Sequence, residues 1–199
     1  MSRFILGLTG SIAMGKTTVS NMFKELGVPV WCADTAVNEL YKPLGKGMIE
    51  IKKIFPAVID ESGVSKEKLK ELIQKDNTIL KKIEDLVHPL LEDSKNIFLD
   101  NNPTKKLLVF DVPLLFEKNQ EKNFNAILLL TASEETQKKR VLSRPGFSND
   151  HFELIKEKQL KEKEKIERAN FVLFTDQSIE KTRKEVKALH SKILNKEII

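Results

Sequence analysis

Apolar residues along the chain gather in short runs, and these runs alternate with longer stretches of mixed polar and apolar residues. A short apolar run closed by glycine or a polar residue is typical of a strand buried on both faces. Such runs predict strands over residues 4–8, 28–31, 106–112, 126–130 and 171–174. Strands of this kind, separated by helices, predict an α/β fold with a parallel sheet covered on both faces.

The stretches between these runs carry apolar residues at helical spacing. Val19, Met22, Phe23 and Leu26 share one helix face, which predicts a helix that starts near residue 16 and ends before Gly27. Similar spacing predicts helices over residues 35–41, 133–143, 150–168 and 178–194.

The segment from residue 46 to 105 differs because it has no convincing strand. Its spacing predicts helices over residues 48–55, 66–75, 78–87 and 89–100. Pro89 is expected to open the last of these, since proline is favoured at the first helical position. We therefore predict a single domain, residues 1–199, with a core of about residues 1–45 and 106–199 and a helical insert over about residues 46–105.

Composition narrows the class of protein. Hydrophobic residues make up 40% of the 199 residues, enough to bury a core. The 34 Lys and Arg exceed the 29 Asp and Glu by five, which gives a net charge of +5 and suits an anionic small molecule. Because lysine and glutamate are interleaved, as in residues 161–165, the charge indicates solvated helix faces and not a nucleic-acid surface.

Targeting features point to the cytoplasm. Cys32 is the single cysteine, so no intramolecular disulfide is possible. The apolar runs are too short to cross a bilayer, and the first residues do not resemble a signal peptide. We therefore expect a cytoplasmic protein without a membrane partner.

Residues 10–17 read Gly-Ser-Ile-Ala-Met-Gly-Lys-Thr and match the phosphate-loop motif G-x-x-x-x-G-K-[ST] between a predicted strand and a predicted helix. In this motif backbone N–H groups form a concave anion site at a helix N-terminus. Lys16 is predicted to reach the β- and γ-phosphates of a nucleotide, and the Thr17 hydroxyl to ligate Mg²⁺. Gly10 and Gly15 are expected where a Cβ would obstruct the turn or the phosphates.

A phosphate loop predicts a fold but does not decide the reaction. A GTPase would carry D-x-x-G after a strand and a base-reading N-K-x-D. Residues 60–63 match D-x-x-G without a convincing strand before them, and N-K-x-D is absent from the sequence. We interpret residues 60–63 as an ordinary turn. Motor and transporter ATPases are longer, so a small-molecule kinase fits the chain best.

Further motifs resemble the dephospho-coenzyme A kinase family. Asp34 matches the second aspartate of its Asp-Ala-Asp motif, and residues 112–117 (Val-Pro-Leu-Leu-Phe-Glu) match its most specific signature. The other matching residues are His88-Pro89, the helical set Gln137, Arg140 and Arg144, and the later set Gln159, Lys165 and Ala169. The order and spacing of these motifs over the whole chain carry the resemblance.

The resemblance implies an enzyme that uses ATP to phosphorylate the ribose 3′-hydroxyl of dephospho-coenzyme A, giving coenzyme A and ADP in the last step of coenzyme A synthesis. It implies Mg²⁺ as cofactor, and a three-layer P-loop kinase fold with a five-stranded parallel sheet, a helical substrate-binding insert and a lid over about residues 145–168. We expect a monomer that binds no nucleic acid.

The resemblance also assigns site residues. Catalysis is assigned to Lys16, Asp34 and Arg140. Substrate binding is assigned to Asp34, His88, Pro113 and Leu114, and the metal to Thr17 and Asp111. ATP binding is assigned to Gly10, Ser11, Ile12, Ala13, Met14, Gly15, Lys16, Thr17, Thr18, Arg144, Lys165 and Thr175.

The chain departs from the family pattern at several of these positions. Ser11, Ala13 and Met14 stand where the family usually has Gly, Gly and Ser. Cys32 replaces the first aspartate of Asp-Ala-Asp, and Asn170 replaces another aspartate. Residues 175–178 replace an Asn-x-Gly-Ser loop that lies near the adenine in the family, which puts the adenine contacts in doubt.

Three acids have a structural alternative to a functional role. Asp34 serves either as the general base toward the ribose hydroxyl or as the N-cap of a helix that starts at Thr35. Asp111 either helps to hold Mg²⁺ or caps the end of its strand. Glu117, after the signature loop, has the alternative of stabilising a helix N-terminus.

The cationic residues and His88 have alternatives as well. Arg140 and Arg144 share a helix face and either clamp phosphate or pair with Glu134 and Glu135 at the surface. For Lys165 the alternative is a solvated lid face.

His88 either contacts substrate or only closes a helix before Pro89.

Other functions remain open at this point. Another P-loop kinase, acting on a small metabolite or a nucleotide, is the nearest alternative, and the Val-Pro-Leu-Leu-x-Glu signature argues against it. A basic nucleic-acid-binding protein with a vestigial phosphate loop is a second, and an aromatic content of only 7% argues against it. An inactive, degenerate kinase is a third.

Overall fold

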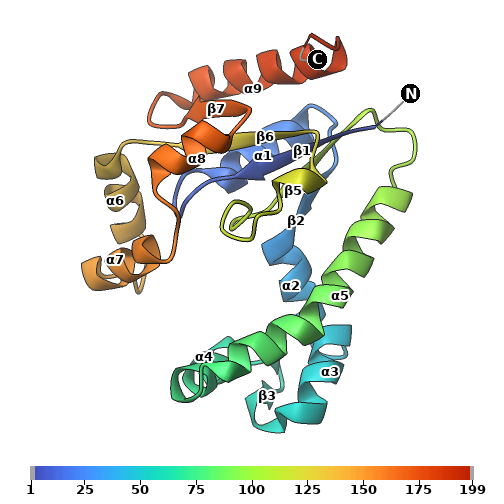
Figure 1. Ribbon diagram of the computed structural model, residues 1–199, viewed down its shortest axis with the longest axis vertical. Coiled ribbons are helices and arrows are strands. Elements are labelled where there is room, and N and C mark those ends of the chain that lie inside the picture. The colour runs from blue at the N-terminus through green and yellow to red at the C-terminus, as the bar shows by residue number, and fades with distance from the viewer. Residues whose placement is uncertain (1–2, 198–199) are drawn as a thin grey trace. The chain divides into compact units, whose positions relative to one another are not determined.

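The computed structural model describes residues 3–197, which divide into two compact units. One unit contains the residues up to Trp31 together with those from Thr104 onward, and the other is Cys32–Pro103. Figure 1 shows both units and the labels of their elements. Each unit has its own hydrophobic core, so each is considered separately below.

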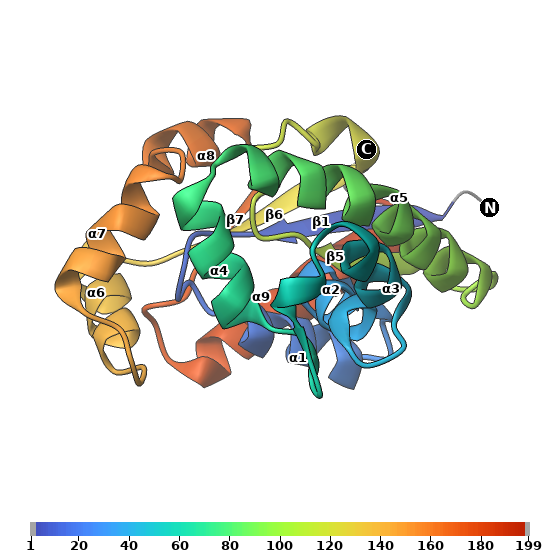
Figure 2. The same cartoon turned by 90° about the horizontal axis from the view of Figure 1, so that it is seen from below.

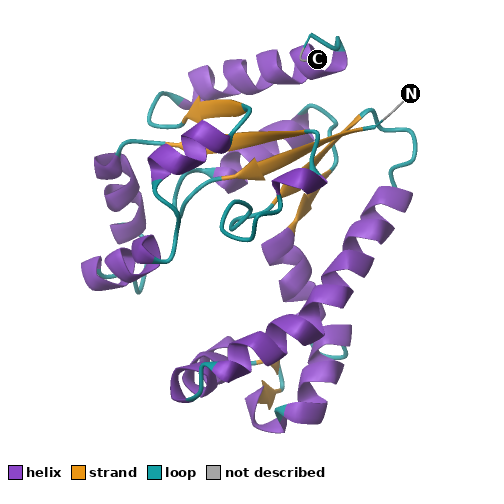
Figure 3. Ribbon diagram, viewed as in Figure 1, coloured by secondary structure: helices purple, strands orange, loops and turns teal. Residues whose placement is uncertain are grey.

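The first unit is built on a parallel five-stranded sheet in the order β2-β5-β1-β6-β7 (Figure 3). The strands are β1 Phe4–Thr9, β2 Val30–Cys32, β5 Leu107–Asp111, β6 Ala126–Thr131 and β7 Phe171–Phe174. The central strand β1 pairs with β5 from Phe4↔Leu107 onward, and with β6 from Leu6↔Ala126. Every residue of β5 and β6 is buried, as the unbroken apolar runs predict.

Helices cover both faces of this sheet. They are α1 Lys16–Glu25, α6 Glu134–Leu142, α7 Asn149–Glu157, α8 Glu162–Arg168 and α9 Ile179–Leu194, with a short 3₁₀ turn at Glu121–Asn123. Helices α1 and α9 pack together on one face, while α8 lies on the opposite face against β6 (Figure 2). Phe23 of α1 and Val186 of α9 meet Leu8 and Leu128 of the sheet in the core. These layers confirm the predicted three-layer α/β fold.

The second unit is mainly helical. Its elements are α2 Ala33–Tyr41, α3 Lys46–Ile54, a 3₁₀ turn Pro56–Val58, β3 Ile59–Asp60, β4 Gly63–Val64, α4 Lys66–Lys75 and α5 Thr78–Asp100. Ile51, Val58, Ile83 and Val87 form the centre of its core. The unit starts at Cys32 and not near residue 46, because α2 packs on α3 and α5.

Two expectations for this segment are wrong. The segment does contain strands, because β3 and β4 form a small antiparallel hairpin around residues 60–63. Those residues are the ordinary turn that the sequence indicated, and Asp60 accepts hydrogen bonds from the Ser62 N–H and hydroxyl at its tip. Gly63 is required there, because its φ is +104° and a Cβ would lie 2.1 Å from the Tyr41 carbonyl oxygen.

The second error concerns Pro89, which does not open a new helix. The 23-residue helix α5 runs through it without interruption. A proline lacks one backbone donor, but the apolar face of α5 continues past it. Ile83 and Val87 are buried in the core before the proline, and Leu91 packs against the same core after it. Packing therefore outweighs the lost hydrogen bond at this position.

In the first unit, the charged stretch 150–168 is two helices and not one. Helix α7 ends at Glu157, and α8 begins at Glu162. Among the described residues, no helix combines the length and apolarity that a membrane crossing requires.

Candidate active site

The phosphate loop joins β1 to α1 in the first unit, as the motif predicts. Gly10 has a φ of +155°, and a Cβ there would lie 2.6 Å from the Leu130 carbonyl oxygen, so only glycine fits against β6. Gly15 has a φ of +84° and occupies the N-cap position of α1. Both glycines are therefore required by geometry, as expected.

The N-terminus of α1 is suited to an anion. Gly15 has no side chain to cap the helix, so the cap position supplies no hydrogen bond to the first-turn N–H groups. The Lys16 side chain folds back on the loop, and its ammonium Nζ donates a hydrogen bond to the Gly10 carbonyl oxygen at 2.8 Å. Thr17 and Thr18 follow on the exposed side of the first turn. Positive charge and backbone donors thus converge at one helix end.

Ala13 departs from the family glycine and adopts a left-handed conformation. Its φ is +62°, a region that costs a non-glycine residue about 1–2 kcal/mol. The buried Ala13 methyl packs with Val141 of α6 and Phe152 of α7, and Ile12 and Phe147 flank the same cluster. Apolar contact with α6 and α7 therefore accompanies this backbone strain.

Oxygen ligands suitable for a hard cation lie at the first turns of α1. The buried Asp111, at the end of β5, accepts a hydrogen bond at 3.0 Å from the Ser20 hydroxyl. Ser20 is three residues after Thr17, and residues three apart on a helix are neighbours. The Asp111 carboxylate is thus held beside α1, at a residue one helical turn after Thr17. A hydroxyl and a carboxylate fit Mg²⁺, which is held by few protein oxygens together with phosphate.

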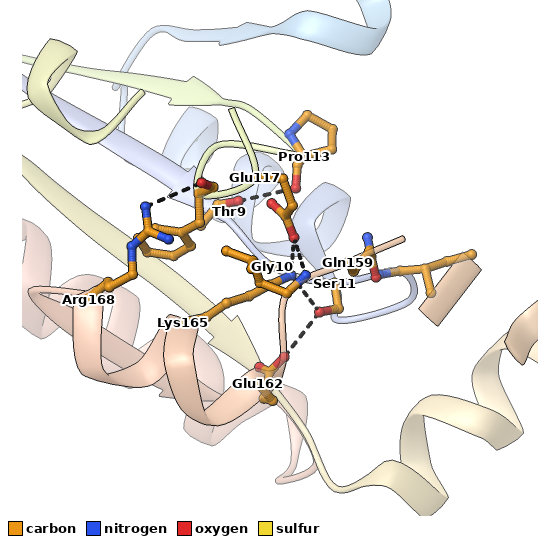
Figure 4. A network of polar contacts seen from close by, with 12 residues as sticks. Thr9, Gly10, Ser11, Pro113, Glu117, Gln159, Glu162, Lys165 and Arg168 are labelled. Carbon is orange, nitrogen blue, oxygen red and sulfur yellow. Dashed lines mark hydrogen bonds and ion pairs between the residues drawn. The ribbon is translucent and has the colours of Figure 1, made fainter. Parts of the chain in front are cut away.

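Lys165 is fully buried, 1% exposed, so the alternative of a solvated lid face is wrong. Its ammonium pairs with the Glu117 carboxylate at 2.7 Å and donates to the Ser11 hydroxyl at 3.0 Å. Ser11 in turn donates to Glu162 at 3.0 Å (Figure 4). The Leu160 N–H also donates to Glu117. The serine that replaces a family glycine is therefore tied to α8.

Glu117 lies in a turn and not at a helix N-terminus, so that alternative is also wrong. Burial alone would raise the pKa of its carboxyl. The hydrogen bonds and charge of Lys165, with backbone N–H donors, outweigh burial and lower the pKa below its ordinary value. Glu117 is therefore ionised in the folded protein at neutral pH.

Arg140 extends toward the phosphate loop and not toward the glutamates of its own helix. Its guanidinium donates to the Thr175 hydroxyl at 3.0 Å, to the Thr175 carbonyl at 2.5 Å, and to the Ala13 carbonyl at 3.4 Å. Thr175 is buried behind the loop, whereas Arg144 is exposed. The alternative that Arg140 pairs with Glu134 or Glu135 at the surface is therefore wrong. Glu134 pairs with Lys156 instead.

The sequence analysis assigned no role to two glutamines that bind the loop. Gln137 Nε2 donates to the Ile12 carbonyl at 3.0 Å, and Gln159 Oε1 accepts from the Ile12 N–H at 3.3 Å. Both residues belong to the motifs that resemble the kinase family, and this was the sequence feature that could have indicated their role. Gln137 is 6% exposed, and a buried glutamine on a highly charged helix is itself a sign of a specific partner.

Pro113 and Leu114 begin the turn after β5. The Pro113 carbonyl accepts a hydrogen bond from the Thr9 hydroxyl at 3.3 Å, which ties the turn to the end of β1. Leu114 is 40% exposed, so its side chain is available for contact with a ligand.

Asp34 and His88 belong to the second unit. Helix α2 starts at Ala33 with Cys32 as its N-cap, so Asp34 lies inside the first turn and is not the cap. Its side chain is exposed. His88 is exposed on α5, 3.9 Å from Glu92, within a continuous helix, so it closes no helix.

Comparison with known proteins agrees with this architecture. The profile of the dephospho-CoA kinase family matches residues 4–181. Dephospho-CoA kinase of Bartonella quintana (strain Toulouse) is 37% identical over 193 residues, which cover 96% of this chain and 98% of that one.

Solved structures extend the comparison. A Thermus thermophilus protein superimposes with a TM-score of 0.84 at 30% identity, covering 96% of this chain and 98% of that one. Dephospho-CoA kinase from Campylobacter jejuni, at 20% identity, shows the same fold with a TM-score of 0.67, covering 96% of this chain and 97% of that one. By the span of the family profile and the identity to its members, the chain belongs to the dephospho-CoA kinase family.

Proposed function

We propose that this enzyme, which phosphorylates dephospho-CoA to CoA, carries out the transfer at the phosphate loop described above, with Mg²⁺ as cofactor. The oxygen of the ribose 3′-hydroxyl forms a bond to the γ-phosphorus of ATP. The bond from that phosphorus to the β–γ bridging oxygen breaks, and ADP leaves. The observation that carries the assignment is the uncapped N-terminus of α1, with Lys16 held at the mouth of the loop.

The residues of the loop bind and orient the triphosphate. Backbone N–H groups of residues 10–18 surround the phosphates, and Lys16 moves its ammonium from the Gly10 carbonyl to the transferring group. Arg144 contributes charge from the turn after α6. Lys165 and Thr175 support the same site from α8 and from the end of β7. Catalysis of this kind depends mainly on positioning and charge stabilisation.

Thr17 and Asp111 are the residues that would hold Mg²⁺. When bound, the ion neutralises charge on the phosphates and fixes their orientation. The Ser20–Asp111 hydrogen bond supports this assignment, because it keeps the carboxylate beside α1.

Asp34 is assigned as the general base that receives the proton of the attacking hydroxyl. It is exposed at the start of α2, two residues after β2, and ligands of α/β sheets bind beyond the carboxyl ends of strands. His88, Pro113 and Leu114 are assigned to dephospho-CoA. We further infer a cytoplasmic monomer that binds neither nucleic acid nor membranes.

The test is a product assay by mass with purified protein, ATP, Mg²⁺ and dephospho-CoA. We expect one phosphate to be added at the 3′ position and ADP to be released, with no turnover when Mg²⁺ is replaced by EDTA. A panel of nucleoside monophosphates and small alcohols serves as the acceptor control. Faster transfer to any of them would contradict the proposal, and filter binding of RNA at physiological salt tests the nucleic-acid alternative.

A further inference from the structure

Three consecutive carbonyl groups of the phosphate loop, those of residues 12–14, receive hydrogen bonds from side chains far away in the sequence. The donors are Gln137 at 3.0 Å, Arg140 at 3.4 Å and Thr175 at 3.2 Å, in the same order as the carbonyls they bind. The single proton of the Thr175 hydroxyl is shared with the Thr131 carbonyl, which also lies at 3.2 Å. Helix α6 supplies the first two donors, and the end of β7 supplies the third. We call these three residues the donor row.

The donor row differs from the other contacts of the loop. The Gly10 carbonyl is bound by Lys16, and the Ser11 carbonyl by the Met14 N–H at 3.3 Å, both from within the motif. The Gly15 carbonyl is bound within α1. Among the residues that the structure describes, the loop carbonyls that take donors from α6 and the end of β7 are those in the middle of the loop, which the motif leaves free to vary.

The peptide bond explains what the donor row achieves. A carbonyl and the N–H of the next residue lie in one plane and point in opposite directions. Outward donors on the carbonyls of residues 12–14 therefore fix the direction of the N–H groups of residues 13–15 on the concave side of the loop. Of these, the Met14 N–H donates to the Ser11 carbonyl within the loop, and the N–H groups of Ala13 and Gly15 belong to the anion site that the loop forms.

Two members of the donor row are buried, and two of them are connected to each other. Gln137 and Thr175 are 6% and 7% exposed, and the Arg140 guanidinium donates to both the hydroxyl and the carbonyl of Thr175. A buried carbonyl that loses its donor is costly, so the loop resists turning its peptides around while the set is intact. The left-handed Ala13 lies in the middle of this segment and would otherwise favour such a change.

We propose that Gln137, Arg140 and Thr175 are positioning residues of the kinase reaction, acting through the backbone of residues 12–14 and not through the nucleotide. The proposal rests on the phosphate-binding role assigned to the loop under Proposed function. It gives Arg140 and Thr175 a different action from direct contact with ATP.

The test uses the full-length protein and two isosteric variants that remove a donor. Thr175→Val deletes the hydroxyl and Thr175→Ser keeps it, while Gln137→Met deletes the amide. Lys139→Met, on the exposed side of α6, is the matched control. For each variant we measure the unfolding temperature first. Well below that temperature we then measure kcat and the affinities for ATP and for inorganic tripolyphosphate.

We expect Thr175→Val and Gln137→Met to weaken binding of both ATP and tripolyphosphate by about 10- to 100-fold, the range for a lost donor to a buried group. Thr175→Ser is expected to stay within about 3-fold of the wild type, a tolerance set by its retained hydrogen bond. Lys139→Met is expected to leave the affinities unchanged.

Three results would overturn the proposal. Folded Gln137→Met with wild-type affinities would remove the role of the loop carbonyls, whatever happens to the Thr175 variants. Weakened ATP binding by Thr175→Val with unchanged tripolyphosphate binding would assign Thr175 to the adenine. A wild-type protein that binds neither ATP nor tripolyphosphate would contradict the proposed function itself, and with it this proposal.

Discussion

The phosphate loop and the start of α2 both carry assigned reactive groups, but they are held in different ways. The loop is fixed on its outer side by side chains from α6, α8 and β7, and most of its own side chains are buried. Asp34, by contrast, lies exposed in the first turn of α2. The difference teaches that contacts from other elements fix the conformation of the phosphate loop, whereas the group assigned to the acceptor is an exposed carboxylate.

The largest effect is expected at Lys16, the residue of the phosphate loop that is assigned to the transferring phosphate. Lys16→Ala should lower kcat by several orders of magnitude and leave folding intact, because charge stabilisation dominates phosphoryl transfer. Initial rates and the circular dichroism spectrum check this. Turnover near that of the wild type would show that the loop is not the site of transfer.

The next effect tests the acceptor end. Asp34→Asn should lower kcat by about 10²- to 10⁴-fold with little change in ATP affinity, the usual contribution of a positioned base. Cys32→Ser, at the N-cap of α2, is its neighbour and control. The Cys32 thiol has no assigned role in the reaction, so this variant should retain most activity.

Either of two results would contradict the assignment of Asp34. Equal damage by Cys32→Ser would show that the start of α2, and not the carboxylate, matters. An Asp34→Asn enzyme that is active but unfolds easily would mean that Asp34 stabilises the helix through its dipole.

A third prediction concerns the stability that the buried Glu117–Lys165 ion pair provides beside the phosphate loop. Glu117→Gln leaves the buried Lys165 ammonium without its anionic partner and should destabilise the fold by about 3 kcal/mol. Because the folded pKa of Glu117 lies below its unfolded value of about 4.3, the pair stabilises the protein above that pH. The stabilisation is lost as the pH falls through the lowered value.

The difference in unfolding free energy between wild type and Glu117→Gln should therefore shrink in acid. Urea unfolding at a series of pH values measures it, and Glu164→Gln, exposed on α8, is the control with no expected effect. A difference that grows on acidification would mean that the pair does not stabilise the folded state.

The smallest effect is expected at Ala13. Ala13→Gly removes the strain of the left-handed backbone, which stabilises the folded protein by about 1–2 kcal/mol. The glycine also destabilises it by about 0.5–1 kcal/mol, because the unfolded chain gains entropy. Loss of the buried methyl group destabilises it by a further 0.8 kcal/mol or so, roughly the value for one buried carbon. These contributions nearly cancel, so thermal unfolding should shift by no more than a few degrees, about 1 kcal/mol in stability. A large shift in either direction would show that the loop backbone rearranges.

The parts of the fold that follow from local pattern could be predicted. The strands of the sheet are unbroken apolar runs, and the loop from Gly10 to Thr17 has its chemistry in consecutive residues. Strands β3 and β4 were missed because two residues each are too few to show a period. Pro89 was misread because the packing of α5 decides its continuity and local propensity does not.

In the candidate site, too, the features that depend on packing between distant segments could not be predicted. Lys165 lies in a run of lysine and glutamate that is typical of a solvated surface, and only the approach of Glu117 from a distant turn explains its burial. The contacts of Gln137 depend likewise on where α6 lies beside the loop. Such contacts between distant segments are absent from spacing along the chain, so the motifs identified these residues but not the contacts by which they hold the loop.

Cys32 offers a practical consequence. It is the single cysteine of the chain, it is half-buried, and it ends β2 and caps α2, at the boundary between the two units. A thiol-reactive fluorophore would therefore attach at one place without any mutagenesis. Its emission would report on solvent at the start of the helix that carries Asp34, so titration with dephospho-CoA could be followed by light in the unmutated enzyme.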